Sequence, residues 1–176
     1  MTLTALVSII GPDRVGLVSA ISGRLFDLGA NLGDTAFAVL GGGAEFTAIC
    51  EFAAEMDLET LQSELEALPE LDGAEVSVSR FDLASMHPAS ETITHMVTVS
   101  GGDSPGLMAR LCEVFEQFNA NIVRLNSERV PGGDGHQYVI TSAVAIPEDA
   151  ANTCLATIGN TAGEMGLDYD YTRVKG

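Results

Sequence analysis

The chain has few basic residues for its length. Lys and Arg together number 8 against 25 Asp and Glu, so the formal net charge is −17. Affinity for nucleic acids rests largely on cationic contacts to phosphate, so this composition argues against direct binding of DNA or RNA. An acidic surface more often serves only to keep a protein in solution. If the chain regulates genes, we expect it to do so through a protein partner.

Cysteine and histidine are also scarce. Cys50, Cys112 and Cys154 are odd in number and far apart, which excludes a disulfide framework and a Cys-based zinc site. The histidines are equally scattered, at His87, His95 and His136. They have neither the spacing of metal ligands nor a Ser or Asp partner that the sequence brings within reach. We therefore expect no metal, no cofactor and no catalytic residue, and the chain is predicted not to be an enzyme.

Long apolar runs are absent as well. No run approaches the roughly 18 residues of a membrane span. The first residues, Met1 to Ala5, lack the basic region and the small-residue cleavage site of a signal peptide. We expect a cytoplasmic protein without a membrane partner.

Apolar residues nevertheless make up 46% of the 176 residues, enough for two cores in two domains of about 85 residues each. In the first half the pattern predicts strands at 3–10, 31–39, 45–52 and 74–81 and helices at 15–28 and 57–68. Val18, Ile21, Leu25 and Leu28 form the apolar stripe of the first helix. Asp57 is the expected N-cap of the second helix.

The second half repeats this order after a linker predicted at 84–92. Residues 5–34 and 95–124 share seven identities without gaps, clustered at one turn and at the start of the following strand. The stripe of the first helix also recurs 90 residues later, as Met108, Leu111, Phe115 and Phe118. The chain is therefore an internal duplication, with domains at 1–83 and 93–176.

The order βαββαβ, read twice, predicts an α+β fold of two ferredoxin-like units. Each unit is an antiparallel four-stranded sheet with two helices on one face. The other face of each sheet is left without a layer, so we expect the two units to pair or the chain to form a homo-oligomer.

The duplicated turn is the candidate site. It runs from Gly11 to Leu17 and again from Gly101 to Leu107, each time opening a helix. Free N–H groups and the helix dipole at such a turn accept an anion such as a carboxylate. The glycine near the helix start lets a ligand approach closely. An adjacent Asp can accept hydrogen bonds from an ammonium group, and an Asn before the next strand can donate and accept. The set fits a zwitterionic amino acid and comprises Asp13, Gly16, Asn31, Asp103, Gly106 and Asn121.

Structural explanations for these residues stay open at this point. An Asp before a helix commonly serves only as an N-cap. The glycines would also allow tight packing of a helix on a sheet, and the two Asn residues would suit the geometry of strand entry.

The motif Asp-x-x-Gly-Leu at the first turn, followed by Ala-Asn-hydrophobic before the second strand, resembles the ACT domain family. The resemblance covers nearly the whole chain as two units. As a tandem of such units the chain is similar to the family of glycine cleavage system transcriptional repressors. The second unit, with Asp103, Gly106 and Asn121, is closer to the common ACT pattern, so we favour it as the binder.

The resemblance implies a non-enzymatic regulatory protein that binds an amino acid, with glycine favoured, and that represses transcription by engaging an activator protein. It also implies that Leu17 and Leu107 belong to the ligand-contacting turns. ACT ligands typically bind between paired domains, which would bring Asp13 to Asn121 and Asp103 to Asn31. A detached ACT regulatory subunit of an amino-acid-metabolising enzyme is the alternative.

Overall fold

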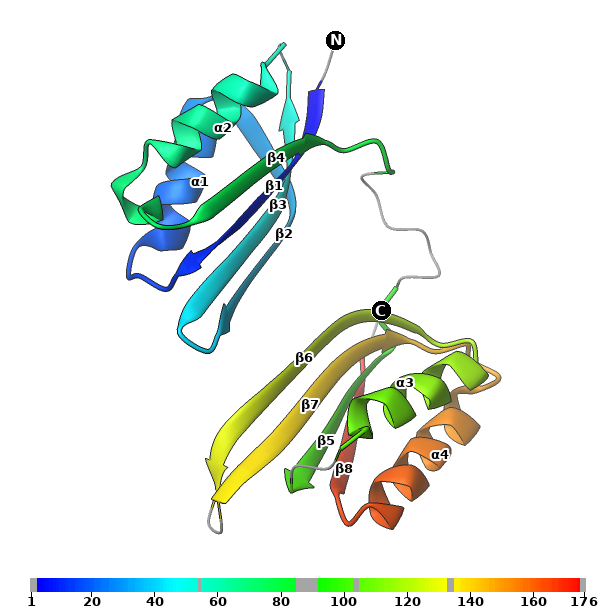
Figure 1. Ribbon diagram of the computed structural model, residues 1–176. Coiled ribbons are helices and arrows are strands. Elements are labelled where there is room, and N and C mark those ends of the chain that lie inside the picture. The colour runs from blue at the N-terminus through cyan, green and yellow to red at the C-terminus, as the bar shows by residue number, and fades with distance from the viewer. Residues whose placement is uncertain (1–2, 54, 85–91, 103–104, 133–134, 175–176) are drawn as a thin grey trace. The chain divides into compact units, whose positions relative to one another are not determined.

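A computed structural model describes residues 3–53, 55–84, 92–102, 105–132 and 135–174. The chain divides into two compact units, Met1–Met86 and His87–Gly176 (Figure 1). Most of the predicted linker, residues 85–91, lies outside the described residues. The predicted domain boundaries, 1–83 and 93–176, stay a prediction.

The first unit has the predicted element order. Its elements are β1 (Leu3–Pro12), α1 (Leu17–Asp27), β2 (Ala30–Leu40), β3 (Gly43–Phe52), α2 (Leu58–Glu66), a 3₁₀ turn η1 (Pro69–Leu71) and β4 (Glu75–Arg80). The strand order in the sheet is β2-β3-β1-β4, and every neighbouring pair is antiparallel. Both helices cover one face of this sheet (Figure 1).

The second unit repeats the arrangement. Its elements are β5 (His95–Gly102), α3 (Leu107–Gln117), β6 (Asn121–Gly132), β7 (Gly135–Ala145), α4 (Ala151–Glu164) and β8 (Asp168–Arg173). The antiparallel order β6-β7-β5-β8 corresponds to that of the first unit. The α+β fold class with two ferredoxin-like units is confirmed.

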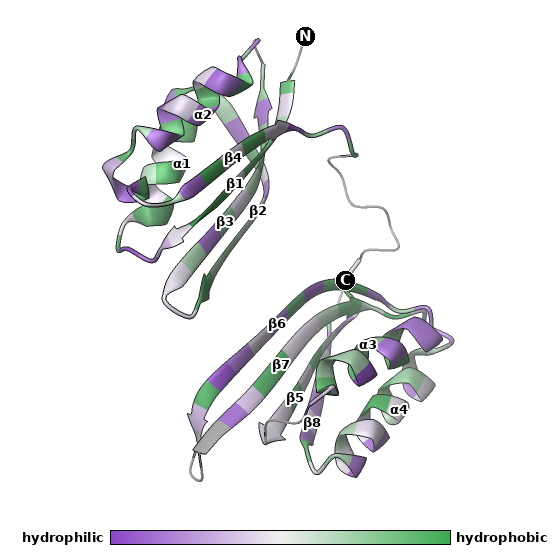
Figure 2. Cartoon of the chain, in the orientation of Figure 1, coloured by the Kyte–Doolittle hydropathy of each residue, from purple (hydrophilic) through white to green (hydrophobic). Residues whose placement is uncertain are grey.

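Each unit has its own core between its helices and one face of its sheet. In β3 the side chains of Phe46, Ala48, Cys50 and Phe52 are buried in alternation, as predicted. In β1 the same alternation buries Leu3, Ala5, Val7 and Ile9. Figure 2 shows hydrophobic and hydrophilic residues interspersed along the helices, which is the pattern of elements with one buried side.

The apolar stripe of α1 differs from the prediction at its start. Leu17, Ile21 and Leu25 are buried, whereas Val18 is 39% exposed. The buried row consists of residues spaced by four that begin at Leu17, and Val18 lies one residue, or about 100° around the helix, away from Leu17. In α3 the predicted Leu111 and Phe115 are buried.

Helix α2 begins as predicted at Asp57. Its carboxylate oxygen accepts a hydrogen bond from the Thr60 backbone N–H at 2.9 Å. This bond lowers the pKa of Asp57, because it stabilises the ionised form.

Among the described residues, no helix is both long enough and apolar enough to cross a membrane.

Candidate functional site

The first helix-entry turn is built by backbone geometry and not by an Asp cap. Gly16 is the N-cap of α1, with φ 92°, and no side chain caps the helix. Asp13 is exposed, and its backbone N–H donates to the Gly42 carbonyl at 3.5 Å. The interpretation of Asp13 as an N-cap is therefore wrong, and its carboxylate is left at the surface of the turn.

Gly16 and Gly106 occupy the same left-handed conformation, with φ 92° and 80°. A side chain built at either position would meet nothing within 4 Å. Tight packing of helix on sheet therefore does not explain these glycines. Glycine is favoured because other residues adopt a positive φ only at a cost.

The leucines after these glycines belong to the cores. Leu17 and Leu107 are 4% and 1% exposed, so only their backbone could reach a ligand. The predicted Asp103 lies outside the described residues.

Asn31 and Asn121 are exposed at the starts of β2 and β6. In each unit the Asn follows the C-terminal end of the helix whose N-terminal end carries the glycine turn. An 11-residue helix is about 16 Å long, so one unit does not bring its own turn and its own Asn together. A site containing both needs the turn of another unit, and the pairing of Asp13 with Asn121 and of Asp103 with Asn31 stays a prediction.

Arg14, for which the sequence suggested no role, anchors the first turn. Its guanidinium donates to the backbone carbonyls of Pro69, Glu70 and Asp72 at 3.2, 3.1 and 2.7 Å. These carbonyls surround η1, 55 to 58 residues along the chain. The duplication gave no signal for this residue, because the second turn has Ser104 at the equivalent position, and the partners of Arg14 come from a loop that the sequence does not connect to it.

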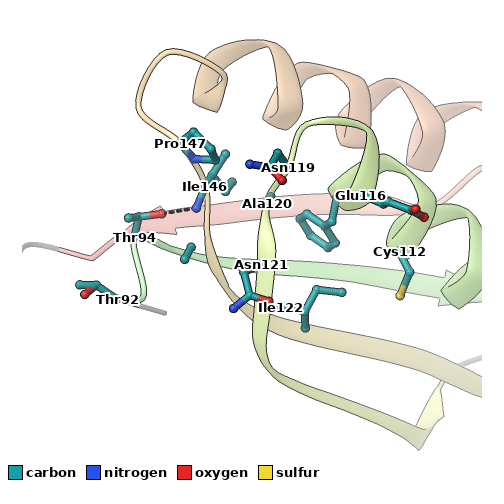
Figure 3. Close-up of a pocket in the computed structure, with 12 residues that line it drawn as sticks. Thr92, Thr94, Cys112, Glu116, Asn119, Ala120, Asn121, Ile122, Ile146 and Pro147 are labelled. Atoms are coloured by element: carbon teal, nitrogen blue, oxygen red, sulfur yellow. Dashed lines mark hydrogen bonds between the residues drawn. The ribbon is translucent and has the colours of Figure 1, made fainter. Parts of the chain in front are cut away.

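The second unit contains an open pocket of about 720 Å³ near Asn121 (Figure 3). This volume lies within the range of small-molecule sites. The pocket is bounded by the C-terminal half of α3, the first residues of β6, the end of β7 and the residues before β5. Its lining residues are Thr92, Thr94, Cys112, Phe115, Glu116, Asn119, Ala120, Asn121, Ile122, Ala145, Ile146 and Pro147. Asn121 is the predicted site residue among them, whereas Gly106 and Leu107 are not.

Thr94 fixes the edge of this pocket. The Ile146 backbone N–H donates to its hydroxyl oxygen at 2.9 Å (Figure 3). The hydroxyl donates to the Val144 carbonyl at 3.2 Å. His95 Nδ1 lies 2.9 Å from the same oxygen. Burial, together with the charge of Arg173, lowers the pKa of His95, so the imidazole is disfavoured as a cation.

Thiol chemistry differs among the three cysteines. Cys50 and Cys154 are buried, and burial raises the pKa of each thiol to about 11. Cys112 is half-buried and lines the pocket.

The described part of the chain contains no group of three or more His, Cys, Asp or Glu residues arranged to hold a metal ion.

Comparisons with known proteins agree with this architecture. Residues 4–79 match the model of the ACT domain. The chain is 29% identical over 164 residues to the glycine cleavage system transcriptional repressor of Escherichia coli (strain K12), covering 86% of this chain and 83% of that protein.

Solved structures extend the likeness to both units. An unknown protein from Galdieria sulphuraria aligns with a TM-score of 0.77 and 29% identity, over 99% of this chain and 100% of that one. A candidate glycine cleavage system transcriptional repressor aligns with a TM-score of 0.68 over 100% and 99% of the chains. At 15% identity, this second likeness concerns the fold alone. Residues 4–79 match the ACT domain, the second unit repeats the same arrangement of strands and helices, and the chain as a whole is similar to the glycine cleavage system transcriptional repressor.

Proposed function

We propose that this chain is a non-enzymatic regulator that binds an amino acid, with glycine favoured. It would modulate transcription of glycine or one-carbon metabolism genes through a protein partner in the cytoplasm. The observation that carries the proposal is the resemblance to a transcriptional repressor along most of both chains. The net charge of −17 supports action through a protein, because an acidic chain has little affinity for DNA.

The chemistry of the turns supports an amino acid as the ligand. Gly16 and Gly106 each open a helix whose first N–H groups have no intrahelical acceptor, and the helix dipole there favours a carboxylate. Asp13 offers a surface carboxylate for the ammonium group. The exposed amides of Asn31 and Asn121 complete the set if a turn and an Asn from different units meet. A ligand bound between units would favour one pairing of units over another, which is how binding would change activity.

Isothermal titration calorimetry with the twenty amino acids, glycine first, tests the ligand. We expect binding to the wild type and weaker binding to Asp103→Ala and Asn121→Ala. Asp149→Ala, two residues before α4, is the control that should bind like the wild type. If no amino acid binds, the sensing proposal fails.

An affinity pull-down tests the partner. The proposal predicts that the chain copurifies with a transcription activator. Copurification with a metabolic enzyme would instead identify a detached ACT regulatory subunit. Binding of the isolated chain to promoter DNA would contradict the proposed route.

A further inference from the structure

The pocket beside α3 has an uneven charge. Glu116 is the one carboxylate among its lining residues, and none of them is Lys, Arg or His. The pocket lies at the C-terminal half of α3, where the helix dipole places partial negative charge on the terminal carbonyls. Both features attract a positive ligand, and neither would hold a carboxylate.

Polar groups at the pocket are unused within the protein. Among the described residues, the side chains of Glu116, Asn119 and Asn121 have no hydrogen-bond partner. Among the described residues, Asn119 is the one non-glycine residue with a positive φ, 53°. It follows the C-terminal end of α3 and lines the pocket. All three residues are exposed; Glu116 offers a charged acceptor on one side of the start of β6, and the Asn121 amide, which donates and accepts, lies on the other side (Figure 3).

The remainder of the lining is apolar. Phe115, Ile146 and Ala120 are buried, and Ile122 and Pro147 are partly buried. In Figure 3 the side chains of Cys112, Glu116 and Ile122 lie on one side of the start of β6. Cys112 and Glu116 are four residues apart on α3 and therefore share one helix face. The carboxylate thus stands beside apolar surface that can receive a hydrocarbon chain.

The duplication provides an internal comparison. The positions 90 residues earlier than Cys112 and Glu116 are Ser22 and Phe26. Phe26 is 76% exposed and carries no charge. The carboxylate on this helix face is therefore a feature of the second unit and not of the repeated fold.

We propose that this pocket binds a small organic ammonium ion with a hydrocarbon body, with Glu116 accepting the ammonium hydrogens. The ligand class differs from the zwitterion proposed for the glycine turns, because the pocket provides no cationic group for a carboxylate. All the lining residues belong to the second unit.

The probe for this site is n-butylammonium, and n-butyrate of the same size is its matched anion. Titration calorimetry measures binding. The rate of Cys112 alkylation by iodoacetamide, an uncharged reagent, measures occupancy next to Glu116. Cys112 can report alone because Cys50 and Cys154 are buried and their thiols resist ionisation.

We expect n-butylammonium to bind and to slow alkylation of Cys112, while n-butyrate does neither. Glu116→Gln keeps the shape of the side chain and removes its charge, so it should weaken binding by about tenfold or more. Glu113→Gln is the matched control, since Glu113 is exposed on the same helix and does not line the pocket. It should bind like the wild type.

Three results would overturn the proposal. They are protection of Cys112 by n-butyrate as strong as by n-butylammonium, unchanged affinity of Glu116→Gln, and no detectable binding of the amine. None of them bears on amino-acid binding at the glycine turns, because each is read from the amine, from Cys112 or from Glu116, and neither residue belongs to those turns. The two proposals can therefore fail separately.

Discussion

Two neighbouring residues of the first turn serve different ends. The carboxylate of Asp13 is exposed, whereas the guanidinium of Arg14 donates hydrogen bonds to three backbone carbonyls around η1. A guanidinium held in this way is not free to bind a ligand carboxylate. The anion would instead meet the backbone N–H groups at the start of α1, and Arg14 acts on the turn by holding its position.

Replacing Arg14 should lower the stability of the first unit. Arg14→Ala removes three hydrogen bonds from a charged donor, so we expect a loss of about 1–3 kcal/mol in the free energy of unfolding. Arg14→Lys should recover only part of it, because an ammonium cannot match the planar fork of donors. Urea denaturation followed by circular dichroism measures both.

Arg24→Ala is the control for this experiment. Arg24 forms an ion pair with Glu64 at 3.3 Å, and both side chains are more than a third exposed. Such pairs contribute little. An Arg24→Ala loss as large as that of Arg14→Ala would contradict the assigned role of Arg14.

His95 makes the second unit sensitive to acid. Its pKa is lowered in the folded state by burial and by Arg173, so the unfolded chain takes up the proton first as the pH falls. The stabilisation is fully present above the unfolded pKa of about 6.5 and is lost as the pH falls through the folded pKa. His95→Asn keeps a hydrogen-bonding group near Thr94 without a titrating ring. Urea unfolding between about pH 7.5 and 5.5 should show a steeper loss for the wild type than for this variant. Parallel pH curves would count against His95.

At the scale of elements, strand pairing explains the first glycine of each turn. A side chain at Gly11 would place its Cβ 2.5 Å from Ala74 Cβ and 2.8 Å from Ala74 Cα. At Gly101, the equivalent position in β5, an added Cβ would meet the end of the Leu167 side chain and would lie 3.3 Å from the Leu167 Cα. In both units the chain entering the last strand passes close to the end of the first. Gly11 allows close approach of the backbone and Gly101 leaves room for Leu167, whereas Gly16 and Gly106 are needed for their left-handed backbone conformation.

Gly11→Ala should therefore displace the start of β4. Because backbone atoms of Ala74 cannot move away as a flexible side chain could, we expect a loss of about 1–3 kcal/mol in the free energy of unfolding. Gly42→Ala is the matched control, because nothing lies within 4 Å of the added methyl group. Thermal unfolding compares the two variants. Equal melting temperatures would show that the contact at Ala74 has no energetic consequence.

At the scale of the whole molecule, the chain has two separate cores. The buried residues of the first cluster all lie between Leu3 and Val76, and those of the second between Val97 and Leu167. Each core is closed by its own sheet and helices, so damage to one should leave the other intact.

Phe46→Ala tests this independence. Phe46 is 1% exposed in the first core, and its truncation should cost about 3–5 kcal/mol. We expect calorimetry to show one unfolding transition moved to lower temperature and one unchanged. Phe115→Ala, also 1% exposed, should move the other transition. A single transition shifted by either variant would mean that the units unfold together.

The sequence by itself determined the fold to a large extent. The geometry of helices and strands sets the spacing of apolar residues, and the repeat at 90 residues shows the same turn and the same apolar stripe a second time. The N-cap at Asp57 was predictable because its bond joins residues only three apart. Interactions between residues close in sequence can be predicted in this way.

Only the tertiary structure decided how the candidate residues are distributed. It separated each glycine turn from the Asn of the same unit by the length of a helix, and it joined Arg14 to carbonyls more than 50 residues away. It also placed Glu116 of α3, and Asn119 just after α3, around the same pocket as Thr94 and Ile146. These contacts depend on which strands become neighbours, since residues distant in sequence meet only after the sheet has formed.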